Sequence, residues 1–327
     1  MPNFIGGESP NYTLSYLEES DVDNNNLYLA DVSWSDRVWD KHRASSDIVA
    51  AYYRGTEFDN YATRIDSCSQ VLNFKLVLVE SESRFKLQSA RFCRVRYCPV
   101  CQWRRSLMWK AKAYKILPMV VEVYPKHQWL FLTLTVKNCQ ILELRETLEW
   151  MNRSWQRMVQ RKKFPAIGWI RSTEITREKD NICHPHFHCL LLVKPDYFRG
   201  EYIKQKDWVE LWKSSLQIDY DPILDIRVVK SCNTVIDIIP EILKYSVKES
   251  DLVNDKNWFL VLTRQMFRLR TVATGGILRG YLRILEKEPE DLIGRQDMIE
   301  EEIDKGSFSF NWNNQDKRYT RSRLTLH

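Results

Sequence analysis

The stretch HPHFHCLLLV, residues 184–193, decides how the rest of the sequence is interpreted. Successive side chains of a β-strand point to opposite faces, so a strand here places His184, His186 and His188 on one face. The alternate residues and the apolar run that follows supply the buried face. Half of the chain's six histidines fall within these few residues. Three imidazoles on one face of a packed sheet are costly to bury unless something binds them, so the pattern predicts a metal site.

A second strand is expected directly before this one, over residues 167–177, joined to it by a short polar turn. If that turn pairs the two strands, Glu174 lies beside His186 and His188. Imidazole suits Zn, Mn, Fe and Cu, and an added carboxylate shifts the preference toward Mn or Mg. Two histidines and one glutamate leave coordination positions open, which is typical of a catalytic site and not of a closed structural one.

Strands and helices alternate along the rest of the chain. Further strands are expected at 71–80, 129–136 and 223–229, and helices at 102–121, 142–162, 202–216 and 240–249. Two adjacent strands joined by a short turn imply an antiparallel or mixed sheet covered by helices, which is an α+β fold. More helical stretches follow residue 257 and are broken at Gly275-Gly276.

The expected helix at 240–249 carries Glu241, Tyr245 and Lys248 at positions i, i+4 and i+7, which share one helix face. Pro240 suits the first turn, where its missing N–H is harmless. By itself this pattern also fits an amphipathic surface helix. Beside the histidine strand it supplies a phenol to form a phosphoester with DNA, a carboxylate to activate a second nucleophile and an ammonium to offset phosphate charge.

A cysteine cluster precedes the sheet. Cys93, Cys98 and Cys101 are spaced C-x4-C-x2-C, and Cys68 lies 25 residues upstream. Tetrahedral zinc needs four such ligands, and a C-x2-C turn supplies two of them. Unrelated buried thiols are the alternative, but three cysteines so close together favour structural zinc. Cys68 is the best candidate for the fourth ligand, with a histidine or a distant cysteine as the fallback.

The charge of the chain is unevenly distributed. Residues 1–60 carry eleven Asp and Glu against four Lys and Arg, whereas residues 83–121 hold ten Lys and Arg and no acidic residue. A basic run interleaved with Trp103 and Trp109 is typical of contact with nucleic acid, although a solvated helix face is the alternative. The expected DNA contacts are Arg94, Arg96, Arg104, Arg105 and Lys110.

No run of 18 or more apolar residues occurs, and the N-terminus lacks a basic-then-apolar signal pattern. We therefore expect a cytoplasmic protein that is neither membrane-spanning nor exported. Five regions are expected: an acidic, variable or partly disordered extension at 1–60, a zinc-binding basic module with its helix at 61–125, a catalytic domain at 126–255, a helical part packed on it at 256–300 and a mobile, basic aromatic tail at 301–327.

Together, these motifs resemble the rolling-circle plasmid replication initiators, the Rep proteins of the HUH endonuclease superfamily. The matching segments are residues 131–135, the histidine motif at 184–188, the tyrosine motif at 244–248 and the cysteine-rich region from Cys68 to Arg105. The order and spacing agree over roughly residues 65–290. Only one tyrosine is in place, because residues 241 and 249 are both glutamate.

The resemblance implies a sheet of about five antiparallel strands with the metal site on one face. His186 and His188 would be ligands for Mn or Mg, with Glu174 as the third ligand and His184 as a weaker candidate or a DNA-contacting group. Tyr245 would nick single-stranded origin DNA, forming a 5′-phosphotyrosine link and a free 3′-OH primer.

The single-tyrosine branch of the family implies further roles. It uses a glutamate one helical turn earlier to activate water at termination, and Glu241 matches that position. Single-stranded and double-stranded origin DNA, a host helicase and a polymerase are the implied partners. Two other interpretations stay open: an HUH transposase or conjugative relaxase, and a non-enzymatic zinc-dependent DNA-binding regulator in which the histidines bind a structural zinc.

Overall fold

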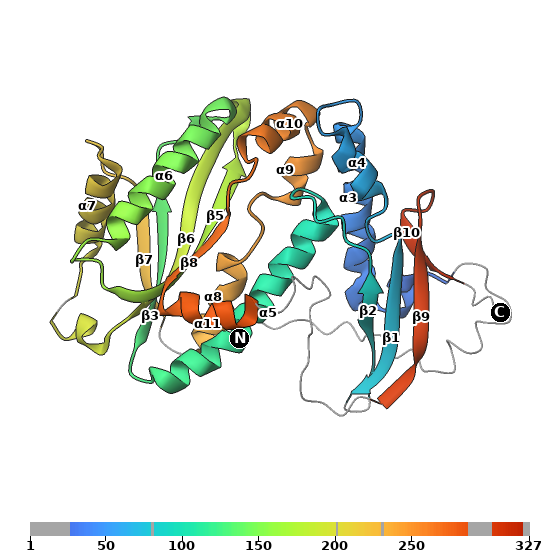
Figure 1. The fold of residues 1–327 in the computed structure, drawn as a ribbon, viewed down its shortest axis with the longest axis horizontal. Coiled ribbons are helices and arrows are strands. Elements are labelled where there is room, and N and C mark those ends of the chain that lie inside the picture. The colour runs from blue at the N-terminus through green and yellow to red at the C-terminus, as the bar shows by residue number, and fades with distance from the viewer. Residues whose placement is uncertain (1–26, 80–81, 201, 230–231, 287–302, 323–327) are drawn as a thin grey trace. The chain divides into compact units, whose positions relative to one another are not determined.

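The computed structural model describes residues 27–79, 82–200, 202–229, 232–286 and 303–322 (Figure 1). The chain divides into two compact units, one comprising Met1–Arg104 with Arg295–His327 and the other comprising Arg105–Gly294. Helix α5 (Pro99–Val123) begins in the first unit and continues into the second. Among the described residues, no helix combines the length and the apolar character that crossing a bilayer requires.

The first unit contains a four-stranded antiparallel sheet in the order β10-β9-β1-β2. Its strands are β1 (Val71–Val79), β2 (Glu82–Ala90), β9 (Ile303–Asn313) and β10 (Arg318–Arg321). Four aromatic rings pack edge to face on this sheet, which stabilises it beyond simple burial. They are Phe74, Phe85, Phe308 and Phe310.

Among the described residues of the first unit, four short or medium helices precede β1. They are α2 (Leu29–Val32), η1 (Trp34–Arg37), α3 (Val38–Tyr53) and α4 (Asp59–Asp66). The buried face of α3 carries Arg43, whose guanidinium donates to the carbonyl oxygens of Ile65 and Asp66 and pairs with Asp47 at 3.0 Å. This buried charge is therefore paired, as burial of a guanidinium requires.

Two expectations about the ends of the chain are wrong. The described part of the expected acidic, variable or partly disordered extension at 1–60 is largely helical, with α2, η1, α3 and the start of α4. The expected mobile tail instead forms β9 and β10, and the alternation of Phe308, Phe310 and Trp312 with small polar residues is the period-two pattern of a half-buried strand. Residues 1–26 and 323–327 lie outside the described residues.

The second unit is built on an antiparallel sheet whose main path has the order β7-β3-β6-β5-β8, with β4 paired to β6. Its strands are β3 (Gln128–Thr135), β4 (Cys139–Gln140), β5 (Ala166–Arg177), β6 (Ile182–Val193), β7 (Leu224–Val229) and β8 (Val272–Gly276). The expected α+β fold, with a central antiparallel sheet of about five strands preceded by a cysteine module, is confirmed.

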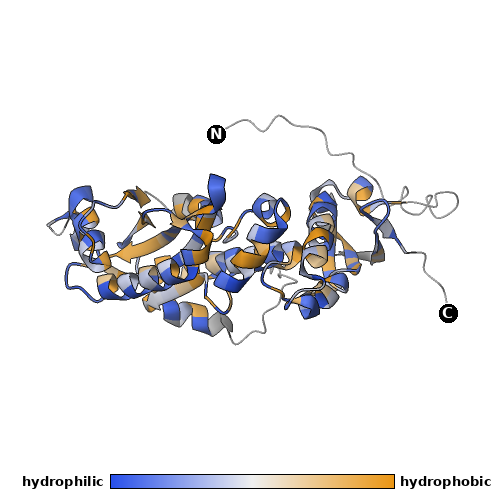
Figure 2. Cartoon of the chain, turned by 90° about the horizontal axis from the view of Figure 1, so that it is seen from above, coloured by the Kyte–Doolittle hydropathy of each residue, from blue (hydrophilic) through white to orange (hydrophobic). Residues whose placement is uncertain are grey.

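Helices cover both faces of this sheet (Figure 1). On the face of Leu190 and Leu192, the core is closed by α5, α8 (Cys232–Ile242) and α11 (Ile277–Glu286). On the opposite face, α6 (Leu144–Val159) places Trp155 against Trp169, and α7 (Gln205–Leu216) places Trp212 near Phe187. The strands between these helices are largely hydrophobic (Figure 2).

Short elements connect these layers. They are η2 (Ile141–Glu143), η3 (Lys179–Asn181), η4 (Pro195–Phe198), α9 (Glu249–Val253) and α10 (Lys256–Gln265). The turn at η3 joins β5 to β6, and both Asp180 (φ 58°) and Asn181 (φ 60°) adopt the left-handed conformation. Asp and Asn tolerate this conformation better than most residues. The N–H of Glu178 donates to the carbonyl oxygen of Ile182 at 2.9 Å and closes the hairpin.

The prediction of a helix at 240–249 is wrong. Helix α8 starts at Cys232, so Pro240 lies in its last turn and not in its first, and the helix ends at Ile242. A proline inside a helix removes one backbone hydrogen bond and crowds the preceding turn, which favours termination soon afterwards. The chain then leaves the helix, and the carbonyl oxygen of Ser246 accepts from the N–H of Ile175 in β5 at 2.8 Å.

Strand β8 was also not predicted, because we interpret the Gly275-Gly276 pair in the sequence as a break between helices. In the structure these glycines allow close packing against β5. A Cβ on Gly275 would lie 2.3 Å from the indole of Trp169, and a Cβ on Gly276 (φ +57°) would lie 2.1 Å from the carbonyl oxygen of Ile167. Both positions therefore require glycine.

We expect Gly276→Ala to destabilise the second unit by about 2 kcal/mol or more, because it combines a backbone clash with a left-handed backbone. Gly280 in α11 is the matched control, because a Cβ added there would meet nothing within 4 Å outside its own helix among the described residues. Gly280→Ala should stabilise the protein by about 0.5–1 kcal/mol. Chemical denaturation checks both values, and equal stabilities of the two variants would contradict the close approach of β8 to β5.

Candidate functional site

The pairing of β5 with β6 brings the predicted carboxylate and imidazoles together. Glu174 lies opposite His186 and Ser172 lies opposite His188 in the strand register. Because side chains alternate along a strand, Glu174, His186 and His188 share one face of the sheet. On the other side of β6, strand β3 places Thr133 opposite His188. The prediction that Glu174 lies beside the two histidines is confirmed.

A single oxygen, Oε2 of Glu174, is the centre of this group. It lies 2.9 Å from His186 Nε2, 2.8 Å from His188 Nε2 and 2.6 Å from Lys244 Nζ. Burial raises the pKa of Glu174, but the hydrogen bonds from His186, His188 and Lys244 outweigh burial and hold the pKa well below its usual range. The carboxylate is therefore ionised at neutral pH.

The second nitrogen of each imidazole is also engaged. Nδ1 of His186 lies 3.2 Å from the carbonyl oxygen of His184, and Nδ1 of His188 lies 3.3 Å from Oγ1 of Thr133. A carbonyl oxygen only accepts, so Nδ1 of His186 donates to it. A ring that binds a metal must be neutral, and its lone pair would then be on Nε2, the nitrogen that faces Glu174. One ligand atom from each of Glu174, His186 and His188 lies within 4.8 Å of the others. This donor set fits a divalent cation with open coordination positions.

His184 does not belong to this group. Its Nδ1 lies 3.8 Å from Oε1 of Glu178, and its ring centroid lies 5.4 Å from that of His186. Burial and the neighbouring His186 lower the pKa of His184. Of the two candidates for a third ligand, the structure groups Glu174, and not His184, with the two histidines.

The segment that carries Tyr245 is bonded to the strand that carries Glu174. Lys244 contacts the Glu174 carboxylate, and the carbonyl oxygen of Ser246 accepts from the N–H of Ile175. Both chain neighbours of Tyr245 are thus bonded to two consecutive residues of β5. Burial raises the pKa of Tyr245 to about 12, so the phenol is protonated at neutral pH.

Glu241 and Lys248 do not share a helix face with Tyr245, because α8 ends before Tyr245, and that prediction is wrong. Glu241 is exposed in the last turn of α8 and interacts electrostatically with Arg227 of β7. Lys248 is the N-cap residue of α9 and lowers the pKa of Asp251, which burial raises. The catalytic roles of Glu241 and Lys248 stay predictions.

Two residues of the site were not assigned from the sequence. Lys244 precedes Tyr245 directly, and a helical interpretation of 240–249 turns it away from the tyrosine face. Thr133 could have been found from the period-two pattern of its strand, since Thr133 and the histidines both alternate with buried apolar residues. The polar face continues onto β7, where Asp225 lies opposite Thr133.

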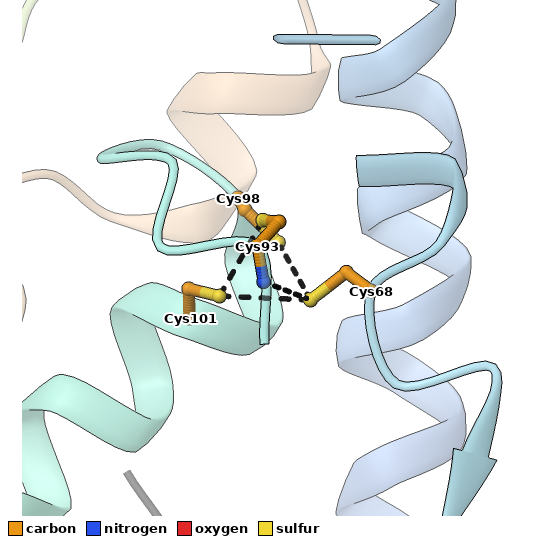
Figure 3. A group of neighbouring side chains, drawn as sticks. All are labelled: Cys68, Cys93, Cys98 and Cys101. Carbon is orange, nitrogen blue, oxygen red and sulfur yellow. Dashed lines mark hydrogen bonds between the residues drawn. The ribbon is translucent and has the colours of Figure 1, made fainter. Parts of the chain in front are cut away.

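The four clustered cysteines converge on one point in the first unit (Figure 3). Cys68 follows α4, Cys93 and Cys98 lie between β2 and α5, and Cys101 lies in the first turn of α5. The Sγ atom of Cys101 lies 3.5 Å from those of Cys68 and Cys93, and the Sγ atoms of Cys98 and Cys68 are 3.8 Å apart. The prediction that Cys68 joins the other three is confirmed.

Backbone N–H groups point at the sulfurs. The N–H of Cys93 donates to Sγ of Cys68 at 3.4 Å, and the N–H of Arg94 donates to Sγ of Cys101 at 3.3 Å. Burial raises the pKa of Cys98, but hydrogen bonds from the other three thiols outweigh burial and hold it well below its usual value. Four buried sulfurs supported in this way fit a closed, four-coordinate metal site.

The residues predicted to contact DNA differ in their exposure. Arg104 is only 9% exposed, and its guanidinium stacks on Trp39 and Trp103 at 5.4 and 5.3 Å from the ring centroids. For Arg104 the prediction is wrong, because the cation is part of the core of the first unit. Burial lowers the pKa of Lys110, which is partly enclosed. For the remaining three, Arg94, Arg96 and Arg105, a DNA contact stays a prediction.

Comparison with known proteins places this fold and site in a family. A family model described as a replication protein (Rep_1) matches residues 84–320 of the chain. The chain belongs to this replication-protein family. The chain is 32% identical over 284 residues to a protein named Protein rep of Streptococcus pneumoniae, and the aligned region covers 83% of this chain and 88% of that relative.

Other relatives extend the comparison. A Protein rep of Lentilactobacillus hilgardii is 33% identical over 280 residues, covering 80% of this chain and 88% of the relative. A replication protein of Staphylococcus aureus is 34% identical over 228 residues, covering 64% of this chain and 96% of the relative. No solved structure matches the chain. The resemblance to the Rep initiators is therefore confirmed from sequence relatives.

Loss of one sulfur ligand should empty the cysteine site. After dialysis against a weak chelator, we expect wild-type protein to retain about one tightly bound metal ion per chain. Cys98→Ser should lose this ion and melt about 5 °C lower or more, because metal binding contributes directly to folding. Cys139→Ser, a half-buried cysteine outside the cluster, is the control. Elemental analysis and thermal melts check this, and a Cys98→Ser protein that keeps its metal would contradict the assignment.

Proposed function

We propose that this Rep protein initiates rolling-circle replication of a plasmid by nicking single-stranded origin DNA. Tyr245 is the nucleophile, and Glu174, His186 and His188 hold a divalent cation. The observation that carries the proposal is the attachment of both neighbours of Tyr245 to Glu174 and Ile175 of the ligand strand. Membership of the replication-protein family supports it independently.

The donor set supports Mn²⁺ or Mg²⁺ at the catalytic site and Zn²⁺ at the cysteine site. Two imidazoles with one carboxylate suit a cation that accepts oxygen ligands in its open positions, whereas four thiolates select zinc. When bound, the catalytic cation withdraws charge from the oxygens of the scissile phosphate. The task of this chain's own residues is to hold that site rigidly on a sheet and to present the phenol beside it.

In the nicking step, Oη of Tyr245 attacks the phosphorus of the scissile phosphodiester. The bond from phosphorus to the 3′ oxygen breaks, and the leaving oxygen takes up a proton to become a free 3′-OH. The phenol loses its proton, so the numbers of bonds and charges balance. Because burial raises the pKa of Tyr245 to about 12, the proton leaves only as the new bond forms or after cationic groups have lowered that pKa.

Glu241 is proposed to act at termination. It lies four residues before Tyr245 and is exposed at the end of α8, where a carboxylate can accept a proton from water. The water that loses this proton attacks the phosphorus of the phosphodiester at the regenerated origin, and the bond from phosphorus to the 3′ oxygen breaks as that oxygen takes up a proton. This cleavage needs no second tyrosine, and the new 3′-OH can then displace Tyr245 from the 5′ phosphate. Lys248 is proposed to offset charge on the phosphate.

DNA is the proposed partner of the whole chain. The formal net charge is +6, and the ten Lys and Arg of residues 83–121 occur without any acidic residue. Single-stranded origin DNA occupies the catalytic face, and Arg94, Arg96 and Arg105 contact the origin duplex. A host helicase and a polymerase use the nicked product, in the cytoplasm.

Tyr245→Phe tests the chemistry with little change in shape, because it removes only the hydroxyl group. Wild-type protein incubated with a single-stranded origin oligonucleotide and Mn²⁺ should form a covalent adduct that denaturing gels resolve. The Phe variant should form none, a loss of about 10³-fold or more. Tyr220→Phe, on a tyrosine that packs on Lys137 in the same unit, is the matched control. An adduct that survives in the Tyr245→Phe variant would exclude this tyrosine as nucleophile.

Glu241→Gln separates termination from nicking. The first adduct should form at nearly the wild-type rate, because Glu241 takes no part in the attack of the phenol. Cleavage of a second origin site by water, and with it release of the protein, should slow by about 10²-fold or more, the contribution typical of a general base. Time courses of adduct formation and decay measure both rates. Unchanged release would show that another group activates the water.

A further inference from the structure

Lys244 occupies an unusual position in the site. Its ammonium lies 2.6 Å from Oε2 of Glu174, the same oxygen that His186 and His188 contact. The Lys244 side chain is 38% exposed, whereas that of Glu174 is only 7% exposed. The lysine therefore reaches a buried anion from the surface of the unit.

The oxygen at the centre of this group has limited capacity. A carboxylate offers about four acceptor positions, two on each oxygen. Three nitrogen atoms already surround Oε2 of Glu174 at hydrogen-bond distance. A divalent cation held by Glu174, His186 and His188 must share this crowded oxygen with the ammonium of Lys244. Two positive groups on one buried oxygen repel each other, so the site favours one or the other.

Lys244 is also attached to the nucleophile. It is the residue directly before Tyr245, and the next residue after the tyrosine, Ser246, is bonded through its carbonyl oxygen to Ile175. The side chain of Lys244 and the backbone of Ser246 are thus both bonded to β5, one on each side of Tyr245. If Lys244 leaves, its bond to Glu174 is lost, while the bond from Ser246 to Ile175 is kept.

We propose that Lys244 is an internal counter-ion of the cation site, which a divalent cation displaces from Glu174. Without the cation, the ammonium neutralises the buried carboxylate and holds the Tyr245 segment against β5. With the cation bound, Lys244 swings outward and the segment loses this attachment to β5. The ammonium then lies next to Tyr245, where it can meet the incoming phosphate. This inference rests on the proposed cation site, and it couples occupancy of that site to presentation of the nucleophile.

The coupling predicts that the lysine weakens cation binding. In Lys244→Met, which keeps the aliphatic part of the side chain, Mn²⁺ should bind roughly tenfold more tightly, the factor that competition with one charge-assisted hydrogen bond gives. Lys244→Arg retains a competing cation and should bind Mn²⁺ with nearly wild-type affinity. Lys256→Met, which removes an exposed lysine elsewhere in the same unit, is the control for loss of charge. Isothermal titration calorimetry with Mn²⁺ alone measures each dissociation constant.

Displacement can be followed in the unmutated protein. Acetylation of lysines by an amine-reactive ester, read by mass spectrometry, should increase severalfold at Lys244 when Mn²⁺ is added. Labelling of Lys256 should stay unchanged. This measurement needs no variant, so it does not depend on whether Lys244→Met folds normally.

The outcomes separate this inference from the proposed function. If wild-type protein binds no Mn²⁺, the proposed cation site itself fails. If Mn²⁺ binds with equal affinity to wild type and Lys244→Met, or labelling of Lys244 does not change on binding, Lys244 is only a structural ion pair and the inference is overturned. Tighter binding in Lys244→Met together with increased labelling of Lys244 in wild type supports displacement.

Discussion

The register of the β5–β6 hairpin is the constraint on which the site depends. A shift of one residue would move the whole row of histidines to the opposite face, where α6 and α7 pack. Two features prevent this shift. Cys183, Pro185 and Phe187 are buried and alternate with less buried residues, which fixes the covered face of β6, and the left-handed Asp180 and Asn181 fix the length of the turn. Glu174 lies opposite His186 because both conditions hold together.

Burial of the Glu174 carboxylate has consequences beyond metal binding. An ionised group that is only 7% exposed must be compensated by donors, and the structure supplies two imidazoles and one ammonium. Because the ammonium belongs to Lys244, this compensation extends to the segment that carries Tyr245. The ion pair of Lys244 with the Glu174 carboxylate therefore helps to position the loop at 243–248, which has no regular secondary structure.

Period-two and helical patterns in the sequence predict the main sheet, the pairing of Glu174 with the histidines and the convergence of the cysteines. They fail where polar or special residues carry the packing. The buried face of α3 includes Arg43, so the apolar periodicity of this helix is weak. Strand β8 was not predicted because it contains Gly275 and Gly276, which allow close packing but give no strand pattern. The helix at 240–249 was misjudged because Pro240 also fits a helix start, and only the contacts with β5 show that the segment after Ile242 is a loop.

The two groups of side chains that could hold a metal ion differ in ways that favour different tasks. The cysteine site has four buried sulfurs and N–H donors directed at them, so its ligand set is complete and its contribution is to folding. The Glu174 site has three ligand atoms, an imidazole of His186 that is 12% exposed and a lysine that competes for its central oxygen. Three ligand atoms whose central oxygen also contacts a lysine bind a cation less tightly than a complete set, and weaker binding is no advantage in a purely structural site. In the proposed function the site admits a phosphate and responds to it, and an open ligand set on the strand to which the Tyr245 segment is bonded suits that task.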